Sequence, residues 1–324
     1  MPADFRPLPF LANAHVQTVL GPIDPTDLGF TLPHEHTQIA LWQIPDRWDY
    51  WQLTRDQPVI LEELAAFREA GGRSLVDLTL AGVGRDPGWL ADIARASGLN
   101  VVMGCGWYRG AYYPPEALID RRSVDSLADE LVAEASEGVG ETGVRPGVIG
   151  EIGTDKPWLS AQEERVHRAA ARAARRTGLA ITTHGVLSAV GLDQLRVFEE
   201  EGADPARVVI GHADSYPVLE HHLAIVERGA CVEFDFLGMS FSAVERHGEG
   251  RVIGLLCELL SRGHVERVLL SQDVCHDSQL TRFGGNGYTY LARTFLPRLR
   301  EAGVSEAEIE TMTVANPRRI LTVG

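Results

Sequence analysis

Six side chains that can bind metal ions or carry protons stand at the ends of short apolar runs in the sequence. They are His34, His36, Glu151, His184, His212 and Asp273. Imidazole together with carboxylate suits zinc, manganese, cobalt or iron better than calcium or magnesium. Six such groups exceed the needs of one tetrahedral zinc ion. They suffice for two ions roughly 3.5–4 Å apart that share a carboxylate and a water-derived hydroxide. The set therefore predicts a site for two divalent metal ions, with zinc as the first choice.

The first run carries two of the six side chains. His34 and His36 are two residues apart, so on a β-strand both would point to one side while Glu35 would face away. A single histidine near a strand end is more often a hydrogen-bonded core residue than a ligand, so the metal prediction rests on the whole set. The other histidines do not share this placement, and we expect most of them to be solvated, with His276 at most at the edge of the site. These others are His15, His167, His221, His222, His247, His264 and His276.

Eight short runs rich in apolar and β-branched residues alternate with segments of helical pattern. The runs are 29–36, 74–80, 100–108, 147–154, 179–185, 208–214, 230–236 and 268–274. Strands that alternate with helices predict a parallel sheet, and right-handed crossovers allow eight units to close into a (β/α)8 TIM barrel. An open doubly wound sheet is the alternative. Helical patterns cover 161–177, 217–229 and 288–303, and no linker divides the chain, so we expect one domain over 1–324.

Charge and cysteine content exclude several classes of protein. The chain has 324 residues with 30 Lys+Arg and 45 Asp+Glu, a formal net charge of −15. This acidity argues against a nucleic-acid partner and against an anionic membrane surface. The 4 cysteines are widely spaced, which fits a reducing compartment. We read no signal peptide and no apolar run near the roughly 20 residues that span a bilayer, so we expect a cytoplasmic protein.

Several segments resemble the phosphotriesterase family of the amidohydrolase superfamily. They are VQTVLGPIDPTDLGFTLPHEH, GVIGEIGT, ITTHG, GHAD, LSQD and GGNGYTYL, in that order from Val16 to Leu321. The resemblance implies that His34, His36 and Asp273 hold the more buried metal ion and that His184 and His212 hold the more exposed one.

The residue expected to bridge the two metal ions differs from that of many family members. Glu151 stands where many members have a carboxylated lysine, so the chain resembles the glutamate-bridged subgroup called phosphotriesterase homology proteins. Both groups offer two oxygens to two cations. Lys156 lies beyond this run and is followed by Pro157, so we assign it to a loop.

The resemblance implies hydrolysis of an ester, lactone or amide of a small molecule by a metal-bridging hydroxide. Asp273 would take the proton and pass it to the leaving group. Phosphotriesterases proper have a histidine after the seventh strand and lactonases commonly an arginine, whereas this chain has Phe236. A phosphotriester or phosphoester hydrolase and a non-catalytic metal-binding barrel are the alternatives.

Residues beyond the third, fourth and seventh runs are candidates to bind substrate. Tyr108, Arg109, Trp158 and Phe236 form this set, with aromatic packing as the alternative role. Arg109 could bind a carboxylate, sulfonate or phosphate with two hydrogen bonds. We allow for a homodimer as the assembly.

Four acidic residues are candidates to hydrogen-bond the ligating histidines, or else buried backbone groups. These are Asp77, Asp214, Glu233 and Asp235.

Overall fold

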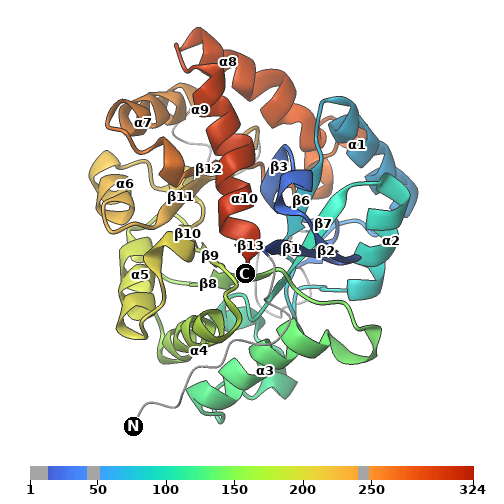
Figure 1. Cartoon of the computed structure of the whole chain (residues 1–324), viewed down its shortest axis with the longest axis vertical. Helices are drawn as coiled ribbons and strands as arrows, with labels where there is room; N and C mark the ends of the chain where they lie inside the picture. The colour runs from blue at the N-terminus through green and yellow to red at the C-terminus, as the bar shows by residue number, and fades with distance from the viewer. Residues whose placement is uncertain (1–13, 42–51, 240–247) are drawn as a thin grey trace.

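The structure, a computed structural model, describes residues 14–41, 52–239 and 248–324 (Figure 1). Eight strands form one sheet in the order β12-β11-β10-β9-β8-β7-β6-β3, and every neighbouring pair in it is parallel. The strands are β3 (Thr31–Glu35), β6 (Ser74–Asp77), β7 (Asn100–Cys105), β8 (Val148–Gly153), β9 (Ile181–His184), β10 (Val208–Ile210), β11 (Cys231–Phe234) and β12 (Val268–Leu270). Each lies within one of the eight predicted runs. The TIM-barrel prediction is confirmed against the open sheet.

Helices surround the strands, as Figure 1 shows. They are α1 (Gln57–Glu69), α2 (Pro87–Ser97), α3 (Val124–Glu137), α4 (Ala161–Thr177), α5 (Val190–Glu200), α6 (Leu219–Val226), α7 (Glu249–Ser261), α8 (Leu296–Glu301), α9 (Glu306–Glu310) and α10 (Asn316–Leu321). Side chains just before several helices accept the first free N–H groups. Asp86 caps α2, Ser123 caps α3, and Ser160 forms a reciprocal capping box with Glu163 at α4.

The three predicted helical segments are confirmed with one difference in detail. The segment 161–177 is α4 itself, and Gly178 ends it at φ 76°, a conformation that favours glycine. Within 217–229 the helix is α6. The segment 288–303 contains a five-residue π-helix (Leu291–Phe295) before α8. Pro297, near the start of α8, has no N–H to donate to the preceding turn, which favours this wider winding.

The amino-terminal end of the barrel is closed by apolar side chains. Strand β1 (His15–Thr18) pairs with β2 (Gly21–Ile23) and with β13 (Thr322–Val323), and α10 leads into β13. In Figure 1, α10 crosses in front of the strands with β13 and β1 beside it. One buried cluster joins these elements to the strand interiors: Val16, Leu28, Val76, Leu78, Val102, Val148, Ala180, Val209, Cys231, Leu269, Ile320 and Leu321.

Three of the histidines that we expected to be solvated are buried, so that expectation is wrong for them. His167 is 0% exposed, its Nδ1 lies 2.7 Å from the Glu163 carbonyl oxygen, and its ring stacks on Phe198. His221 and His222 on α6 are also buried. Burial lowers the pKa of each of these imidazoles to about 4, so they remain neutral near pH 7. His247 lies outside the described residues.

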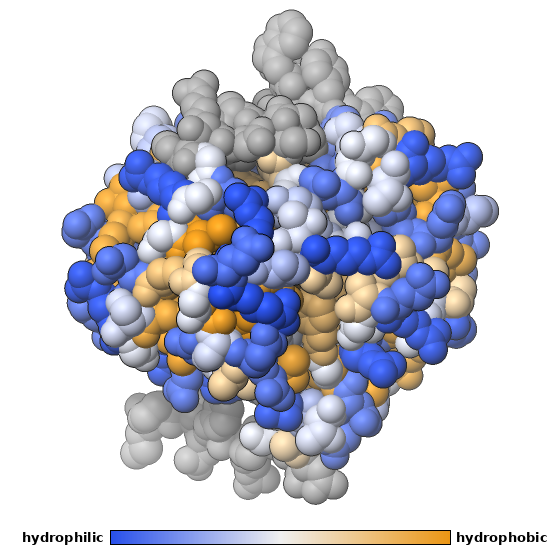
Figure 2. All heavy atoms as spheres, turned by 90° about the horizontal axis from the view of Figure 1, so that it is seen from above, coloured by the Kyte–Doolittle hydropathy of each residue, from blue (hydrophilic) through white to orange (hydrophobic). Residues whose placement is uncertain are grey.

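Figure 2 shows hydrophilic side chains spread over one face of the molecule, with smaller hydrophobic areas between them. Within residues 14–41, 52–239 and 248–324, no helix is both long and apolar enough to cross a membrane.

Candidate metal centre

The six predicted ligands converge at the carboxyl ends of the barrel strands. These residues are 0–7% exposed, although they are up to 239 residues apart in sequence. They form two groups whose ligand atoms lie within 4.8 Å of one another, namely His34, His36 and Asp273, and Glu151, His184 and His212. The groups touch, because His34 Nε2 lies 3.5 Å from Glu151 Oε1. This is the division into two positions that the family resemblance implies.

In the first group, two imidazoles face one carboxylate. Asp273 Oδ1 lies 3.2 Å from His36 Nε2 and 4.0 Å from His34 Nε2. The pairing of β3 with β6 shifts register between Leu32 and Glu35, so the strand carries an irregularity at His34. Asp273 has a left-handed backbone with φ 47°. Local irregularity of this kind re-aims side chains at the edge of a barrel.

In the second group, Glu151 lies between two histidines. Its Oε1 is 2.6 Å from His184 Nδ1 and 2.9 Å from His212 Nε2. Strand β8 shifts register against β9 between Ile149 and Ile152, again at the ligand position. The preceding Gly150 has φ 124°, and a Cβ there would come within 2.1 Å of the Thr182 carbonyl oxygen. Only glycine permits this close approach of β8 to β9.

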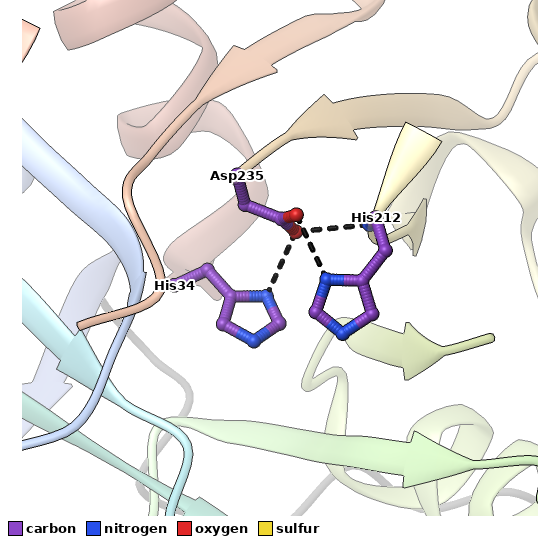
Figure 3. Close-up of side chains that lie close together, drawn as sticks. All are labelled: His34, His212 and Asp235. Atoms are coloured by element: carbon purple, nitrogen blue, oxygen red, sulfur yellow. Dashed lines mark hydrogen bonds and ion pairs between the residues drawn. The ribbon is translucent and has the colours of Figure 1, made fainter. Parts of the chain in front are cut away.

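Carboxylates behind the histidines fix the orientation of the rings. Asp235 follows β11 directly, with Oδ2 3.1 Å from His34 Nδ1 and Oδ1 2.8 Å from His212 Nδ1 (Figure 3). Asp235 Oδ2 also accepts the backbone N–H of His212. Glu233 Oε2 lies 3.3 Å from His34 Nδ1, and the Thr79 hydroxyl lies 2.8 Å from His36 Nδ1. With Nδ1 paired in all three rings, Nε2 faces the centre, which is the arrangement of metal-ligating histidine.

The carboxylates dominate the electrostatics of the site. Burial alone would lower the pKa of His212, but Asp235 and Glu151 raise it to about 10. Burial would likewise lower the pKa of His34, yet Asp235 and Glu151 raise it well above its usual range. Burial lowers the pKa of His184 to about 4, and the neighbouring His212 contributes in the same direction. The site therefore favours positive charge at its centre.

The donor set fits divalent metal ions. Within the part of the chain that the structure describes, His34 Nε2 and Asp273 Oδ1 are buried without a hydrogen-bond partner, and both face the centre. His184 Nδ1 and His212 Nε2 lie only 2.7 Å apart beside Glu151. Glu151 Oε1 lies 2.6 and 2.9 Å from the same two nitrogens, so two ring nitrogens and a carboxylate oxygen meet at one point. A cation would satisfy all of these atoms.

The predicted substrate-binding residues separate into those near the centre and one outside it. The Tyr108 hydroxyl lies 3.3 Å from His184 Nδ1, and burial holds the pKa of this phenol well above its usual range. The Arg109 guanidinium stacks on Tyr108 and Tyr112 and lies 3.6 Å from Asp155. Tyr108 is therefore a neutral hydrogen-bond donor beside the ligands.

Phe236 and Trp158 differ in their relation to the centre. Phe236 stacks on His212, with ring centroids 4.4 Å apart. Trp158 is 59% exposed, beyond the end of β8. Lys156 is exposed and pairs with Asp155, which agrees with its assignment to a loop. The roles of all these residues in substrate binding stay predictions.

The residues that pair with the ligating histidines are only partly indicated by the sequence. Glu233 and Asp235 were only candidates, although their spacing of two on one strand indicates a shared face. Glu35 was expected to face away, and it does point away from the centre. Its carboxylate nevertheless contacts the segment that carries Asp273, a contact that no local pattern indicates.

Comparison with known proteins adds a family to this geometry. The model of the phosphotriesterase family matches residues 14–321. A phosphotriesterase homology protein of Escherichia coli (strain K12) is 37% identical over 91% of this chain and 97% of its own length. An N-acetyltaurine hydrolase of Tetraodon nigroviridis is 30% identical over 96% of this chain and 98% of its own.

A solved structure has the same fold over nearly the whole chain. The crystal structure of a resiniferatoxin-binding protein from Rhodobacter sphaeroides superposes with a TM-score of 0.88, at 36% identity, over 95% of this chain and 94% of that one. The match to the family model spans the eight barrel strands and all six convergent side chains. The chain is therefore a hydrolytic enzyme that belongs to the phosphotriesterase family.

Proposed function

We propose that this protein hydrolyses a carboxylic amide, ester or lactone of a small molecule with two divalent metal ions, zinc being the first choice. His34, His36 and Asp273 would hold one ion, and His184 and His212 the other, with Glu151 between them. The observation that carries the proposal is this convergence of four imidazoles and two carboxylates, with Nδ1 of His34, His36 and His212 already paired to groups behind the centre. Manganese, cobalt and iron suit the same donors.

Bound metal ions of this class lower the pKa of water and polarise the oxygen of the bond to be cleaved. The chain itself supplies the proton transfer. Asp273 is 7% exposed and faces both histidines of its group, so it takes the proton of the attacking water and delivers it to the leaving group. The Tyr108 phenol stays protonated and can donate to the substrate oxygen as negative charge develops there.

Residues around the centre favour a carbonyl substrate over a phosphotriester. The stretch 234–238 at the end of β11 holds no histidine to relay a proton, and Phe236 there stacks on His212. The N-acetyltaurine hydrolases among the relatives are named for an amide substrate, and they match nearly the whole chain. Arg109 lies one residue beyond Tyr108 and could bind an anionic group of such a substrate.

The experiment is a substrate screen with metal-depleted and zinc-loaded protein. Aryl esters, lactones, N-acyl amides including N-acetylated amino sulfonates, and phosphotriesters form the panel. We expect zinc-dependent turnover of a carbonyl class and little or none of phosphotriesters. Preferred turnover of phosphotriesters would favour a phosphotriester or phosphoester hydrolase instead. No turnover of any class with two equivalents of zinc bound would favour a metal-binding barrel without catalysis.

Further properties belong to the same proposal. A cytoplasmic location is supported by the four cysteines, which are all free thiols. A single domain over 1–324, a homodimer, and the absence of nucleic-acid and membrane partners stay predictions.

A further inference from the structure

The seam between the first and last barrel strands is joined chiefly by side chains. β3 and β12 are the two ends of the sheet order. The Ser271 hydroxyl accepts the N–H of His34 at 3.0 Å and also lies 2.9 Å from the His34 carbonyl oxygen. The Glu35 carboxylate, 0% exposed, reaches across the same seam. This seam separates His34 from Asp273, so its geometry sets the first group of the metal centre.

The backbone at Asp273 needs support from its surroundings. Its φ of 47° lies in the left-handed region, which costs a residue other than glycine about 1–3 kcal/mol. Such a turn directs neighbouring peptide N–H groups to one side, where an anion can accept them. The N–H groups of Gln272 and Val274 both point at Glu35, at 2.9 Å from Oε1 and 2.8 Å from Oε2.

We propose that Glu35 is a positioning residue that holds Asp273 in its working orientation by accepting the peptide N–H groups on either side of it. The inference rests on the proposed function, because Asp273 is there the metal ligand and proton carrier. Glu35 itself does not touch the centre. Its two oxygens are fully used by Gln272, Val274 and the Ser271 hydroxyl, 2.8 Å away.

Other contacts at Asp273 cannot replace those of Glu35. The N–H of Asp273 donates to the His34 carbonyl oxygen at 3.2 Å, and its carbonyl oxygen accepts from Gln279 Nε2 at 2.9 Å. These fix the peptide groups of Asp273 itself. Without Glu35, the flanking N–H groups would be buried without acceptors, and a shift of the turn to reach new ones would displace the Asp273 carboxylate.

The test compares Glu35→Gln and Glu35→Ala with a control residue of α10 that contacts the other end of β12. Glu35→Gln keeps one oxygen for Ser271 and Gln272 but presents an amide N–H₂ to the N–H of Val274. Asn316 is also buried, and its side chain donates to the Val265 and Val268 carbonyl oxygens at the other end of β12. Asn316→Ala therefore destabilises β12 without touching the turn at Asp273.

Two readouts are measured on folded, zinc-loaded protein. For Glu35→Gln we expect kcat on the best substrate of the panel to fall 10- to 100-fold while KM changes less than threefold. We also expect the zinc affinity of one of two sites, measured by chelator competition, to fall at least tenfold. Glu35→Ala should lower kcat and zinc affinity further than Glu35→Gln does. Asn316→Ala should change kcat and zinc affinity by no more than twofold, although its melting temperature should fall.

The outcomes distinguish this inference from the proposed function. Unchanged kcat and unchanged zinc affinity in Glu35→Gln would overturn the positioning role. Equal losses in Asn316→Ala would also overturn it, because the effect would then be general to β12. If the wild-type protein turned over no substrate, the proposed hydrolysis would fail, while selective zinc loss in Glu35→Gln would still support the positioning of Asp273.

Discussion

The two ends of the barrel interior are built from the same strands but from opposite chemistry. Along β9 the inward residues are Ala180, Thr182 and His184, and the last of these reaches the metal centre. At the amino-terminal end every member of the buried cluster around α10 is apolar. At the carboxyl end the buried side chains are imidazoles and carboxylates.

Strands β11 and β12 repeat this change at the same spacing. Cys231 and Glu233 lie on β11 with Asp235 just after it, and Leu269 lies on β12 with Ser271 and Asp273 just after it. Each strand thus changes from apolar to polar within four residues. Layers of this kind separate the stability of a barrel from its chemistry. We therefore expect residues at the carboxyl end to contribute to activity but little to stability. Residues at the amino-terminal end should contribute to stability but little to activity.

The largest effect is expected from a single atom exchange at the carboxyl end. Asp273→Asn removes the proton acceptor, and general acid–base groups contribute about 10²–10⁴-fold, so kcat should fall by that order. The free energy of unfolding should change little, because Asp273 Oδ1 has no hydrogen-bond partner among the described residues and an amide oxygen can keep its 3.2 Å contact with His36 Nε2. Steady-state kinetics and urea unfolding measure the two quantities. Near-normal turnover would remove Asp273 from the mechanism, and Asp129→Asn on the exposed face of α3 is the control.

The amino-terminal end should respond in the opposite way. Ile320 is 4% exposed in the cluster under the barrel, and truncation of a buried isoleucine costs about 2–5 kcal/mol. Ile320→Ala should therefore lower the melting temperature while kcat of the folded enzyme stays within twofold. Leu20 lies after β1 and is 51% exposed, so Leu20→Ala should cost little. A large loss of kcat in folded Ile320→Ala would show that the two ends are not separable.

Low pH should reduce stability through His167 on α4, which belongs to neither end of the barrel interior. His167 has a pKa of about 4 when folded and about 6.5 when unfolded, so the unfolded chain binds the proton first as pH falls. Its contribution is complete above pH 6.5 and is lost on approach to pH 4. Between pH 7.5 and 4.5 this amounts to about 2–3 kcal/mol.

Substitution isolates the contribution of His167. In His167→Phe, the free energy of unfolding in urea should fall by about 2–3 kcal/mol less between pH 7.5 and 4.5 than in the wild type. The phenyl ring should still pack on Phe198. His221 and His222 would keep their own share in both proteins. Parallel pH profiles of the two proteins would contradict the assignment to His167.

A smaller effect is expected where one carboxylate serves both metal positions. Asp235 pairs with Nδ1 of His34 in one group and of His212 in the other. Loss of such an outer partner costs about 10–100-fold in metal affinity, so Asp235→Asn should weaken zinc binding at both positions. Chelator competition measures this. Glu163→Gln, in an equally buried carboxylate away from the centre, should leave zinc affinity unchanged, and weakening at one position only would contradict the shared role.

The regular part of this architecture was accessible from the sequence. Strand ends of a barrel meet at one edge, so polar residues that end apolar runs could be brought together without coordinates. The eight strands, α4 and the convergence of the six side chains follow from that rule. The helical shell was harder, because His167 lies one turn beyond Glu163 and one turn before Ala170 on the buried face of α4, and the residue type alone favoured solvent.

The irregular part was not accessible, since it depends on contacts distant in sequence. The register shifts at His34 and Glu151 and the left-handed turn at Asp273 have no strong local signal apart from Gly150. The role of Glu35 needs the approach of residues 271–274, more than 230 positions away. Period-two alternation places Glu35 on the correct face but cannot name its partner.

The smallest effect should come from the layer between the two ends. Thr182 and Glu233 line a cavity of about 20 Å³ together with apolar residues, including Ile320 and Leu321. The cavity is mostly apolar, but its size suits about one water molecule, and the Thr182 hydroxyl and Glu233 Oε1, both without a partner among the described residues, are the groups that such a water could bond. Thr182→Val removes one partner of that water but keeps the shape of the side chain, so the free energy of unfolding should change by less than about 1 kcal/mol. Zinc affinity should stay within twofold.

A neighbour on the same strand provides the comparison for Thr182→Val. Thr183 faces the other way, and its hydroxyl lies 3.3 Å from the Val209 carbonyl oxygen and 3.4 Å from the Gly211 nitrogen. Thr183→Val should therefore cost about 1 kcal/mol or more in urea unfolding, because the Gly211 N–H loses a buried acceptor. A gain of stability in Thr182→Val would mean that no water molecule bonds the Thr182 hydroxyl. Thr182 would then belong to the apolar end of the barrel interior. A loss of zinc affinity would instead mean that Thr182 supports the metal centre. Thr182 would then belong to the polar end of the barrel interior.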